Sequence, residues 1–256
     1  TKVILMYLES IADGTKFLEL AREISLRKPI IIVKSGTSEA GTKAISSHTG
    51  SLAGSDNAVA TAFCQGGIIR AQTIEDLFDY AKAFSYQEPP QGDRVGIITN
   101  AGGPGIMATD ELARAGLKLV TLSEATQQQL AEGLPSTAAL GNPVDVIGDA
   151  LADRYRHAIS TVLASGEVDS LLVILTPQVM TQVKRVAGVT TALAHQHEDI
   201  TVLSAFIGGE SIERGRMVFR RHRFPNYPYP ERAIDVLQKM QQYGAWKRAE
   251  TVRREA

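Results

Sequence analysis

The chain alternates short apolar runs with segments of helical periodicity over nearly all of its 256 residues. This alternation is the sequence pattern of βα units, in which helices cover both faces of a parallel sheet. The pattern predicts strands at 3–8, 30–34, 68–70, 94–99, 171–175 and 201–205, and helices at 14–26, 56–65, 73–84, 104–115, 150–164, 182–195, 211–221 and 231–243. The fold class is therefore α/β.

A polar stretch with two prolines and a glycine, residues 88–93, separates the two halves of the chain and marks a domain boundary. We expect a first domain at 1–87, a second at 94–245, and a charged, fraying helical tail at 246–256. The second half has a complete flavodoxin-like layout. Three strands are few for a doubly wound sheet, so the chain is predicted to hold two flavodoxin-like domains, the first truncated at its N-terminus.

Composition excludes several classes of protein. The single cysteine, Cys64, excludes an internal disulfide and agrees with a reducing, cytoplasmic compartment. The net charge of −1 gives nucleic acid no general attraction. No apolar run approaches the roughly 20 residues of a membrane helix. The chain begins at Thr1, directly on a strand, and so reads as a piece of a longer protein.

One histidine lies in a loop of small and polar residues between the strand at 30–34 and the helix that begins near Asp56. The sequence around it is Ile45-Ser46-Ser47-His48-Thr49-Gly50-Ser51-Leu52-Ala53-Gly54-Ser55. Unstructured loops longer than roughly 12 to 15 residues in compact domains are usually functional or disordered. An imidazole there can act as a base, a metal ligand or a nucleophile. The hydroxyls and free amides of Ser47, Thr49 and Gly50 suit it to phosphate chemistry, while a purely structural histidine stays open.

Five motifs together resemble one family. They are Leu8-Glu9, Lys34-Ser35-Gly36 with Ser46–Gly54, Thr99-Asn100-Ala101-Gly102-Gly103-Pro104-Gly105, Asn142-Pro143-Val144-Asp145, and Tyr229-Pro230-Glu231. In order and spacing they look like the nucleoside-diphosphate-forming (ADP-forming) acyl-CoA synthetases, relatives of succinyl-CoA synthetase. The resemblance covers nearly the whole chain and implies a phosphohistidine domain followed by a flavodoxin-like CoA-ligase domain.

The resemblance assigns roles to individual residues. It implies that His48 carries a phosphoryl group and that Glu9, at the end of the first strand, hydrogen-bonds the imidazole. A helix start at Gly148, Asp149 and Ala150 would point its dipole at the phosphate. Asp149 departs from the all-glycine form of the relatives, and an acid there is unfavourable beside phosphate unless it only caps the helix.

A second glycine-rich segment follows the strand at 94–99. Free amides at a helix start bind anions, which makes Asn100, Gly102, Gly103 and Gly105 candidates for substrate binding. The spacing matches neither the dinucleotide fingerprint nor a P-loop. A tight strand-to-helix turn without a ligand is an equally good interpretation.

The other histidines favour structural interpretations. His195 and His197 lie at a helix end, where a cationic ring suits the dipole. His157 is expected on a helix surface, and His222 belongs to a basic cluster with Arg220, Arg221 and Arg223. We expect no metal site, because no His, Asp or Glu set has ligand spacing.

The predicted function is the phosphoryl-carrying core of an ADP-forming acyl-CoA synthetase. The resemblance implies CoA, phosphate and ATP or ADP with Mg²⁺ as ligands, bound mainly by a CoA-binding Rossmann-like domain and an ATP-grasp module outside this chain. We expect an oligomer, with no nucleic acid or membrane partner, and no turnover by this segment alone. The alternatives are a non-catalytic regulatory or acyltransferase-associated module, or a simple nucleotide- or CoA-binding domain.

Overall fold

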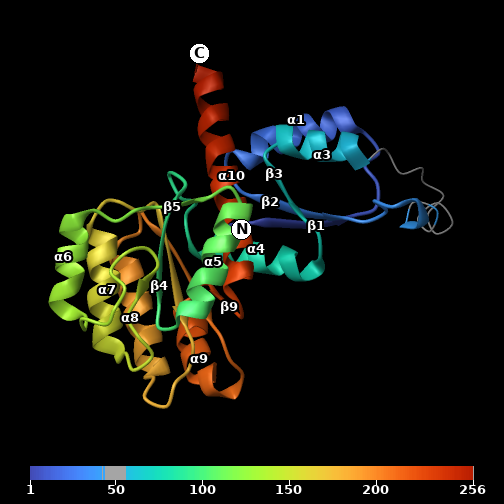
Figure 1. The fold of residues 1–256 in the computed structure, drawn as a ribbon. Coiled ribbons are helices and arrows are strands. Elements are labelled where there is room, and N and C mark those ends of the chain that lie inside the picture. The colour runs from blue at the N-terminus through green and yellow to red at the C-terminus, as the bar shows by residue number, and fades with distance from the viewer. Residues whose placement is uncertain (42, 44–55, 256) are drawn as a thin grey trace. The chain divides into compact units, whose positions relative to one another are not determined.

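The computed structural model describes residues 1–41, 43 and 56–255 of the chain. These form two compact units, the first made of Thr1–Ser85 and Gln242–Ala256 and the second of Tyr86–Gln241. Each unit contains a parallel sheet with helices packed on it (Figure 1). The predicted α/β fold class is confirmed.

The first unit has a three-stranded parallel sheet in the order β1-β2-β3. Its strands are β1 (Ile4–Leu8), β2 (Ile30–Lys34) and β3 (Ile68–Ala71), and its helices are α1 (Gly14–Ser25), α3 (Asp56–Gln65) and α4 (Ile74–Tyr86). In Figure 1, α1 and α3 lie on one side of this sheet and α4 on the other. The predicted strands and helices of this unit agree with the observed ones to within two residues, and Thr73 caps α4 through a 3.1 Å hydrogen bond from Asp76 N–H to its hydroxyl.

Alternate residues of the three strands form the buried face under α1 and α3. Ile30 and Ile32 of β2 pack with Ile68 of β3 and with Phe63 of α3. Because side chains alternate between faces along a strand, Lys34 lies on the same face as Ile30 and Ile32. The apolar face therefore ends in a charged residue at the carboxyl edge of the sheet.

The second unit has a parallel sheet in the order β5-β4-β7-β8-β9, with β6 paired to the far end of β4. Its strands are β4 (Arg94–Thr99), β5 (Lys118–Leu119), β6 (Val144–Asp145), β7 (Ser170–Leu175), β8 (Thr201–Phe206) and β9 (Asn226–Tyr227). The order is that of a flavodoxin-like sheet, whose topological switch point lies between the first strand and the third, here β4 and β7.

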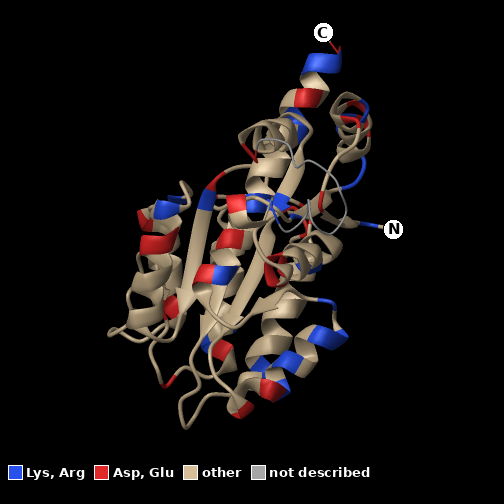
Figure 2. Ribbon diagram, turned by 90° about the vertical axis from the view of Figure 1, so that its right-hand side faces the viewer, with Lys and Arg blue, Asp and Glu red and all other residues tan. Residues whose placement is uncertain are grey.

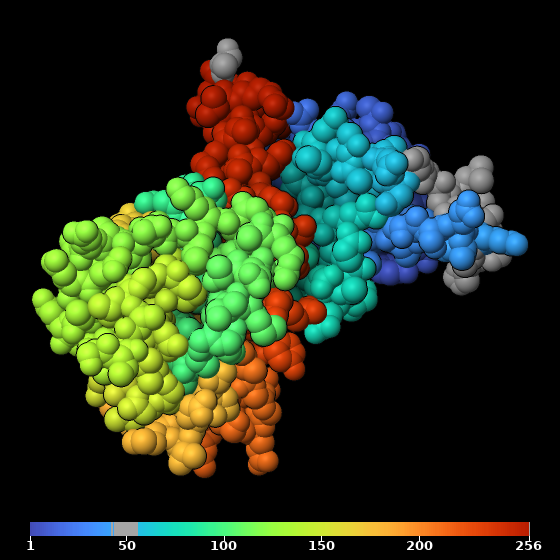
Figure 3. All heavy atoms as spheres, viewed as in Figure 1, coloured from blue at the N-terminus to red at the C-terminus, as the bar shows by residue number. Residues whose placement is uncertain are grey.

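The helices of the second unit alternate with its main strands along the chain. They are α5 (Gly102–Arg114), α6 (Glu124–Gly133), α7 (Ala152–Ala164), α8 (Val183–Gln196), the 3-10 turn η1 (Glu210–Ile212), α9 (Glu213–Arg221) and the start of α10 (Pro230–Glu255). Residues of α6 and α7 form much of the face of this unit that is turned to the viewer in Figure 3. The exposed arginines of α9 belong to the positive segments drawn blue in Figure 2.

Sequence patterns missed four elements of the second unit: β5, β6, β9 and α6. The three strands have two residues each, which is too short for a period-two alternation. Helix α6 is almost entirely polar and buries only Thr126 and Leu130. Its one clear signal is the cap at Ser123, whose hydroxyl accepts a 3.2 Å bond from Thr126 N–H.

The C-terminal segment differs from the expected frayed tail. Helix α10 continues to Glu255, and residues from Gln242 onward belong to the first unit. Tyr243 donates a 2.6 Å hydrogen bond to the carbonyl of Ser25, and the Trp246 indole donates to Gln65 O at 3.3 Å. The charged residues of 246–256 therefore lie on a helix that is packed on the first unit, because Tyr243 and Trp246 anchor the start of this segment.

A partly buried ion pair fixes the same segment further along. Glu250 has a 4% exposed side chain and accepts two hydrogen bonds from Arg22, at 3.0 and 2.9 Å. Burial acts to raise the pKa of Glu250, but the bonds from Arg22 and Arg254 outweigh it and hold the pKa below its usual value. No helix in the described part of the chain is long and apolar enough to cross a membrane.

Candidate functional site

Glu9 follows β1 directly, at the carboxyl edge of the first sheet. This is the edge at which open α/β sheets bind their ligands. The end of the neighbouring strand β2 is hydrogen-bonded to the end of β1, since Ser35 N–H donates to Leu8 O at 3.0 Å. Within the described part of the chain, no side chain donates a hydrogen bond to the Glu9 carboxylate. The carboxylate is therefore available to a group that arrives from elsewhere.

Lys34, which the sequence analysis quoted as a motif residue without assigning it a role, holds the Glu9 main chain. The residue is 8% exposed, and its ammonium donates to Glu9 O at 2.7 Å and to Ser35 O at 2.5 Å. Burial lowers the pKa of Lys34, as does the nearby Arg70, while Asp56 and Glu9 act to raise it. A lone cation at the end of an otherwise apolar central strand was the signal available in the sequence.

Asp56 and Arg70 complete the charged cluster at this edge. Arg70 of β3 pairs with Asp56, the first residue of α3, at 2.6 Å. Two cations and two carboxylates, Glu9 and Asp56, thus surround the ends of the three strands. We name Glu9, Lys34, Asp56 and Arg70 the strand-end cluster.

The predicted phosphorylated residue lies outside the described residues. His48 and its predicted phosphate-binding neighbours Ser47, Thr49 and Gly50 all fall within 44–55. Residues 35–41 and 43 lie between the end of β2 at Lys34 and this segment, and the described chain resumes at Asp56, the first residue of α3. Asp56 belongs to the strand-end cluster.

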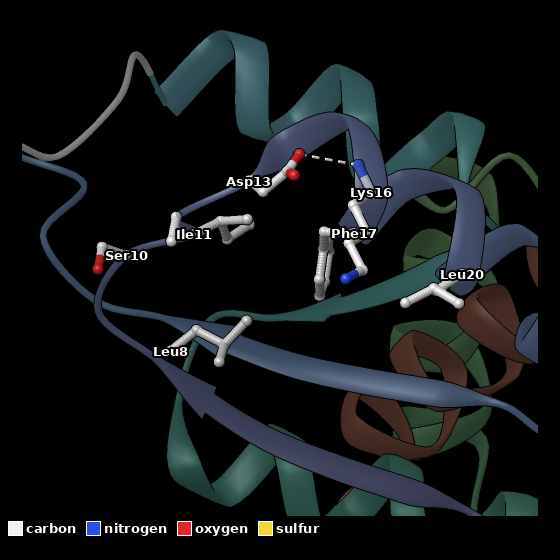
Figure 4. A pocket seen from close by; sticks show the side chains of 8 residues that line it. Leu8, Ser10, Ile11, Asp13, Lys16, Phe17 and Leu20 are labelled. Atoms are coloured by element: carbon white, nitrogen blue, oxygen red, sulfur yellow. Dashed lines mark hydrogen bonds between the residues drawn. The ribbon is translucent and has the colours of Figure 1, made fainter.

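An open groove of about 320 Å³ lies next to Glu9 along α1. Leu8 and Ser10, the residues on either side of Glu9, line it together with Ile11, Phe17 and Leu20 (Figure 4). Asp13 at its rim caps α1 by accepting a 3.0 Å bond from Lys16 N–H. The groove is mainly apolar, whereas the strand-end cluster beside it is charged.

At the switch point of the second unit, Asn100 joins the ends of β4 and β7. Its side-chain amide donates to Thr176 O at 2.8 Å, and its side-chain oxygen accepts from Thr176 N–H at 2.8 Å. Asn100 is 2% exposed. These bonds show a structural role for the side chain, and its predicted contact with substrate stays a prediction.

The glycines at the start of α5 divide into two kinds. An added Cβ at Gly105 would lie 3.1 Å from Thr99 Cγ2, so this glycine is needed for close packing of helix on strand. Gly102 and Gly103 are exposed, and an added Cβ at Gly103 would meet nothing within 4 Å. Of the three, only Gly102 and Gly103 present their main chain at the surface.

The turn before α7 carries the predicted phosphate-binding residues of the second unit. Gly148 lies opposite the switch point, where an added Cβ would be 3.7 Å from Gln178 Cγ and 3.8 Å from Asn100 O. Ile147 has a φ of 69°, a costly conformation for a β-branched residue, and its N–H donates to Asp145 Oδ1 at 2.8 Å.

Two of the three predicted residues of this turn differ from expectation in their bonding. Ala150 N–H donates to Ile147 O at 3.0 Å, so this amide is already used within the turn. Asp149 does not cap α7, whose N-cap residue is Leu151. It pairs with Arg154 instead, and that hydrogen bond holds the pKa of Asp149 below its usual value. Arg154 also donates to Val146 O at 3.2 Å, which ties this charge pair to the turn.

The remaining histidines make main-chain contacts. The His157 ring is half-buried, not on the open surface as expected, with Nε2 2.9 Å from Gln129 O. The His195 ring lies 2.7 Å from Thr191 O in the last turn of α8. A carbonyl oxygen only accepts hydrogen bonds, so His157 Nε2 and His195 Nδ1 are each the donor in these contacts.

Models of two protein families match the chain one after the other. Residues 1–84 match a succinyl-CoA ligase-like flavodoxin domain, and residues 95–252 match a Ligase-CoA domain. The chain belongs to the ADP-forming acyl-CoA synthetase family. This confirms the family that the five sequence motifs indicated.

Relatives in this family are named as ADP-forming ligases. The alpha subunit of acetate–CoA ligase I from Pyrococcus furiosus is 39% identical over 248 residues, which cover 96% of this chain and 54% of that subunit. The 4-hydroxybutyrate–CoA ligase of Nitrosopumilus maritimus is 36% identical over 248 residues, covering 96% of this chain and 35% of that enzyme.

A solved structure in the family matches the whole chain. It is the dinucleotide-forming acetyl-coenzyme A synthetase 1 of Candidatus Korarchaeum cryptofilum, in complex with phosphate and ADP. The TM-score is 0.92 at 35% sequence identity, and the match covers all of this chain and 56% of that one. This chain thus spans about half, or less, of the length of the relatives that it matches.

Proposed function

We propose that this chain is the phosphoryl-carrying core of an ADP-forming acyl-CoA synthetase and that His48 is the residue phosphorylated. Membership of the family supports this, as do relatives named as ADP-forming ligases. The observation that carries the proposal is the position of Glu9. Its carboxylate stands at the carboxyl edge of the sheet, next to the end of β2, the strand that precedes His48 in the chain, and has no donor among the described residues.

The proposed reaction has three displacements. Phosphate attacks the carbonyl carbon of an acyl-CoA, the C–S bond breaks, and CoA leaves as an acyl phosphate forms. A ring nitrogen of His48 then attacks the phosphorus, and the acid leaves as its carboxylate. An oxygen of the ADP β-phosphate finally takes the phosphoryl group and gives ATP. Each step exchanges one nucleophile for one leaving group, so the sequence is reversible and needs no redox partner.

Glu9 would act on the ring nitrogen that is not phosphorylated. By accepting a hydrogen bond from that N–H, the carboxylate fixes the tautomer and leaves the other nitrogen nucleophilic. It also stabilises the positive charge that develops on the ring as the N–P bond forms. A charge-assisted hydrogen bond of this kind is worth about 1.5 to 3 kcal/mol.

For the phosphate itself we propose the main chain around His48 and the turn before α7. Ser47, Thr49 and Gly50 are our candidates in the first unit, and Gly148 with the Asp149 amide are our candidates in the second. Arg154 supports this role for the turn, because it neutralises the Asp149 carboxylate that would otherwise repel an anion.

Substrate contacts are proposed at the main chain of Gly102 and Gly103, with Asn100 beside them. CoA and ATP or ADP would bind mainly to a CoA-binding Rossmann-like domain and an ATP-grasp module. We assign Mg²⁺ to the nucleotide at the latter, because the described residues contain no group of three or more His, Cys, Asp or Glu side chains fit to hold a metal ion. The complete enzyme is proposed to be a cytoplasmic oligomer, and this segment alone is not expected to turn over acyl-CoA.

Phosphorylation of the complete enzyme tests the proposal. Acetyl phosphate labelled in the phosphoryl group should transfer one label to His48, and the label should be acid-labile and base-stable, as a phosphoramidate is. His48→Ala should abolish it. Glu9→Gln should slow labelling about ten- to a hundredfold, since each 1.4 kcal/mol is worth a factor of ten.

The matched control is Glu19→Gln, an exposed glutamate on α1 of the same unit, which should label at the wild-type rate. Label that persists in His48→Ala would reject the proposal. A complete enzyme that takes no label at all would favour the non-catalytic alternative.

A further inference from the structure

Lys34 presents an unusual combination of burial and charge. It ends the central strand of the first sheet, after four consecutive apolar residues, and only 8% of it is exposed. Lysine is almost never buried to this extent unless it is paired, because an unpaired ammonium loses its hydration. The partners of the ammonium therefore indicate what the residue is for.

Those partners are main-chain carbonyls on two separate strand ends. The β1–β2 ladder runs from Ile4 paired with Ile30 to Leu8 paired with Lys34 and ends there. Beyond it, the ammonium bonds Glu9 O at 2.7 Å and Ser35 O at 2.5 Å. Through this bond Lys34 connects β2 to Glu9, which lies one residue beyond the last paired residue of β1.

Among the described contacts, neither carboxylate of the strand-end cluster accepts a hydrogen bond from the Lys34 ammonium. The Asp56 carboxylate is held by Arg70 at 2.6 Å. No hydrogen bond joins the Glu9 carboxylate to Lys34 among the described contacts. The ammonium therefore fixes the main chain of Glu9 without occupying its side chain.

We propose that Lys34 is the positioning residue of the phosphorylation site, which holds the main chain of Glu9 so that the carboxylate meets the His48 imidazole. The proposal rests on the proposed function and adds to it. Lys34 would touch neither acyl phosphate nor the imidazole, so its loss should lower the maximal rate and leave the KM for acyl phosphate unchanged.

Two measurements on the complete enzyme test this. Hydrogen exchange of the peptide that spans residues 8–12 reports whether the Glu9 main chain is held, independently of any activity. We expect faster exchange in Lys34→Met, which keeps the length of the side chain, and wild-type exchange in Lys28→Met, an exposed lysine of the same unit. Lys34→Arg, which keeps a charged donor, should restore most of the protection.

The second measurement is a double-mutant cycle on the rate of His48 phosphorylation. Lys34→Met should lower the maximal rate about tenfold, and it should lower it little further in a Glu9→Gln background, because the two residues act through one contact. If Lys34→Met does not fold, Lys34→Gln, which keeps a neutral donor, takes its place in both measurements.

The outcomes separate the two proposals. Unchanged exchange at 8–12 overturns the anchoring role of Lys34, whatever the activity. Faster exchange with additive effects on the rate makes Lys34 structural only and overturns its positioning role. A wild-type enzyme without label on His48 overturns the proposed function and the positioning role with it, whereas the exchange result still decides whether Lys34 anchors Glu9.

Discussion

Replacing Asn142 by alanine is expected to destabilise the second unit by about 2 kcal/mol. The side chain of Asn142 lies where β4 changes partners, because β4 pairs with β5 at its start and with β6 at its end. Its oxygen accepts from Ile97 N–H at 2.9 Å, and its amide donates to Val95 O at 2.8 Å and to Val120 O at 2.9 Å. The side chain of Asn142 thus makes hydrogen bonds to β4 between the residues that pair with β5 and those that pair with β6.

The magnitude follows from the groups that lose a partner. Val95 O keeps a second donor, Val120 N–H at 3.2 Å, whereas Ile97 N–H and Val120 O lose the bond to Asn142. A buried polar group without its partner costs about 1 to 3 kcal/mol. Asn142 is half-buried, which gives water a path to both groups, so about 1 kcal/mol each is appropriate.

Urea unfolding followed by circular dichroism, with hydrogen exchange at β4 to identify the unit, measures this change. Asn142→Asp keeps the acceptor and loses both donors, so it should destabilise as well. The control is Gln128→Ala on the exposed side of α6, which should stay within about 0.5 kcal/mol of wild type. An Asn142→Ala protein as stable as that control would refute the reasoning.

Three further predictions concern other contacts. Glu250→Gln should cost about 1 to 3 kcal/mol at pH 7. Because the folded-state pKa of Glu250 is lowered, the extra stability of the wild-type protein is present above the ordinary carboxyl pKa and is lost as the pH falls through the folded-state pKa. The unfolding curves of the two proteins should therefore converge in acid, and a stability difference that does not change with pH would contradict this. Gly67→Ala should destabilise the first unit, since φ is +65° and the new Cβ would lie 2.4 Å from the Trp246 ring; an unchanged melting temperature would argue against that packing. Asp149→Asn should tighten binding of inorganic phosphate about two- to fivefold, because it removes an exposed negative charge from the turn and leaves the Arg154 cation in place; calorimetry that finds equal or weaker binding would remove the turn from the phosphate site.

Local pattern was sufficient for the main strands and helices. The apolar run at 30–34 and the helix at 56–65 have the observed bounds, because burial on both faces and a 3.6-residue period are properties of consecutive residues. Helix α6 was missed because Leu130 is the one apolar residue that it buries, so its sequence shows no apolar face. The end of α10 was misjudged because Trp246 packs on Gly67, which is far away in sequence.

The candidate site shows the same division. Glu9 could be found because a strand end is readable from the sequence and a family motif marks it. The role of Lys34 could not, since its acceptors are carbonyls, which no residue type reveals. Likewise, only the geometry of the turn shows that the Ala150 amide is already bonded while Arg154 neutralises Asp149.

The division of α10 between the two units has a consequence for synthesis. Residues 1–85 of the first unit are synthesised before the second unit, but Tyr243, Trp246 and Glu250, which pack on them, are synthesised after it. At about 5 to 20 residues per second, roughly ten to thirty seconds of translation separate the two. The second unit, contiguous in sequence, can finish folding during that interval. The nascent first unit would meanwhile expose the apolar surface that α10 later covers, so chaperone binding is expected to concentrate on residues 1–85.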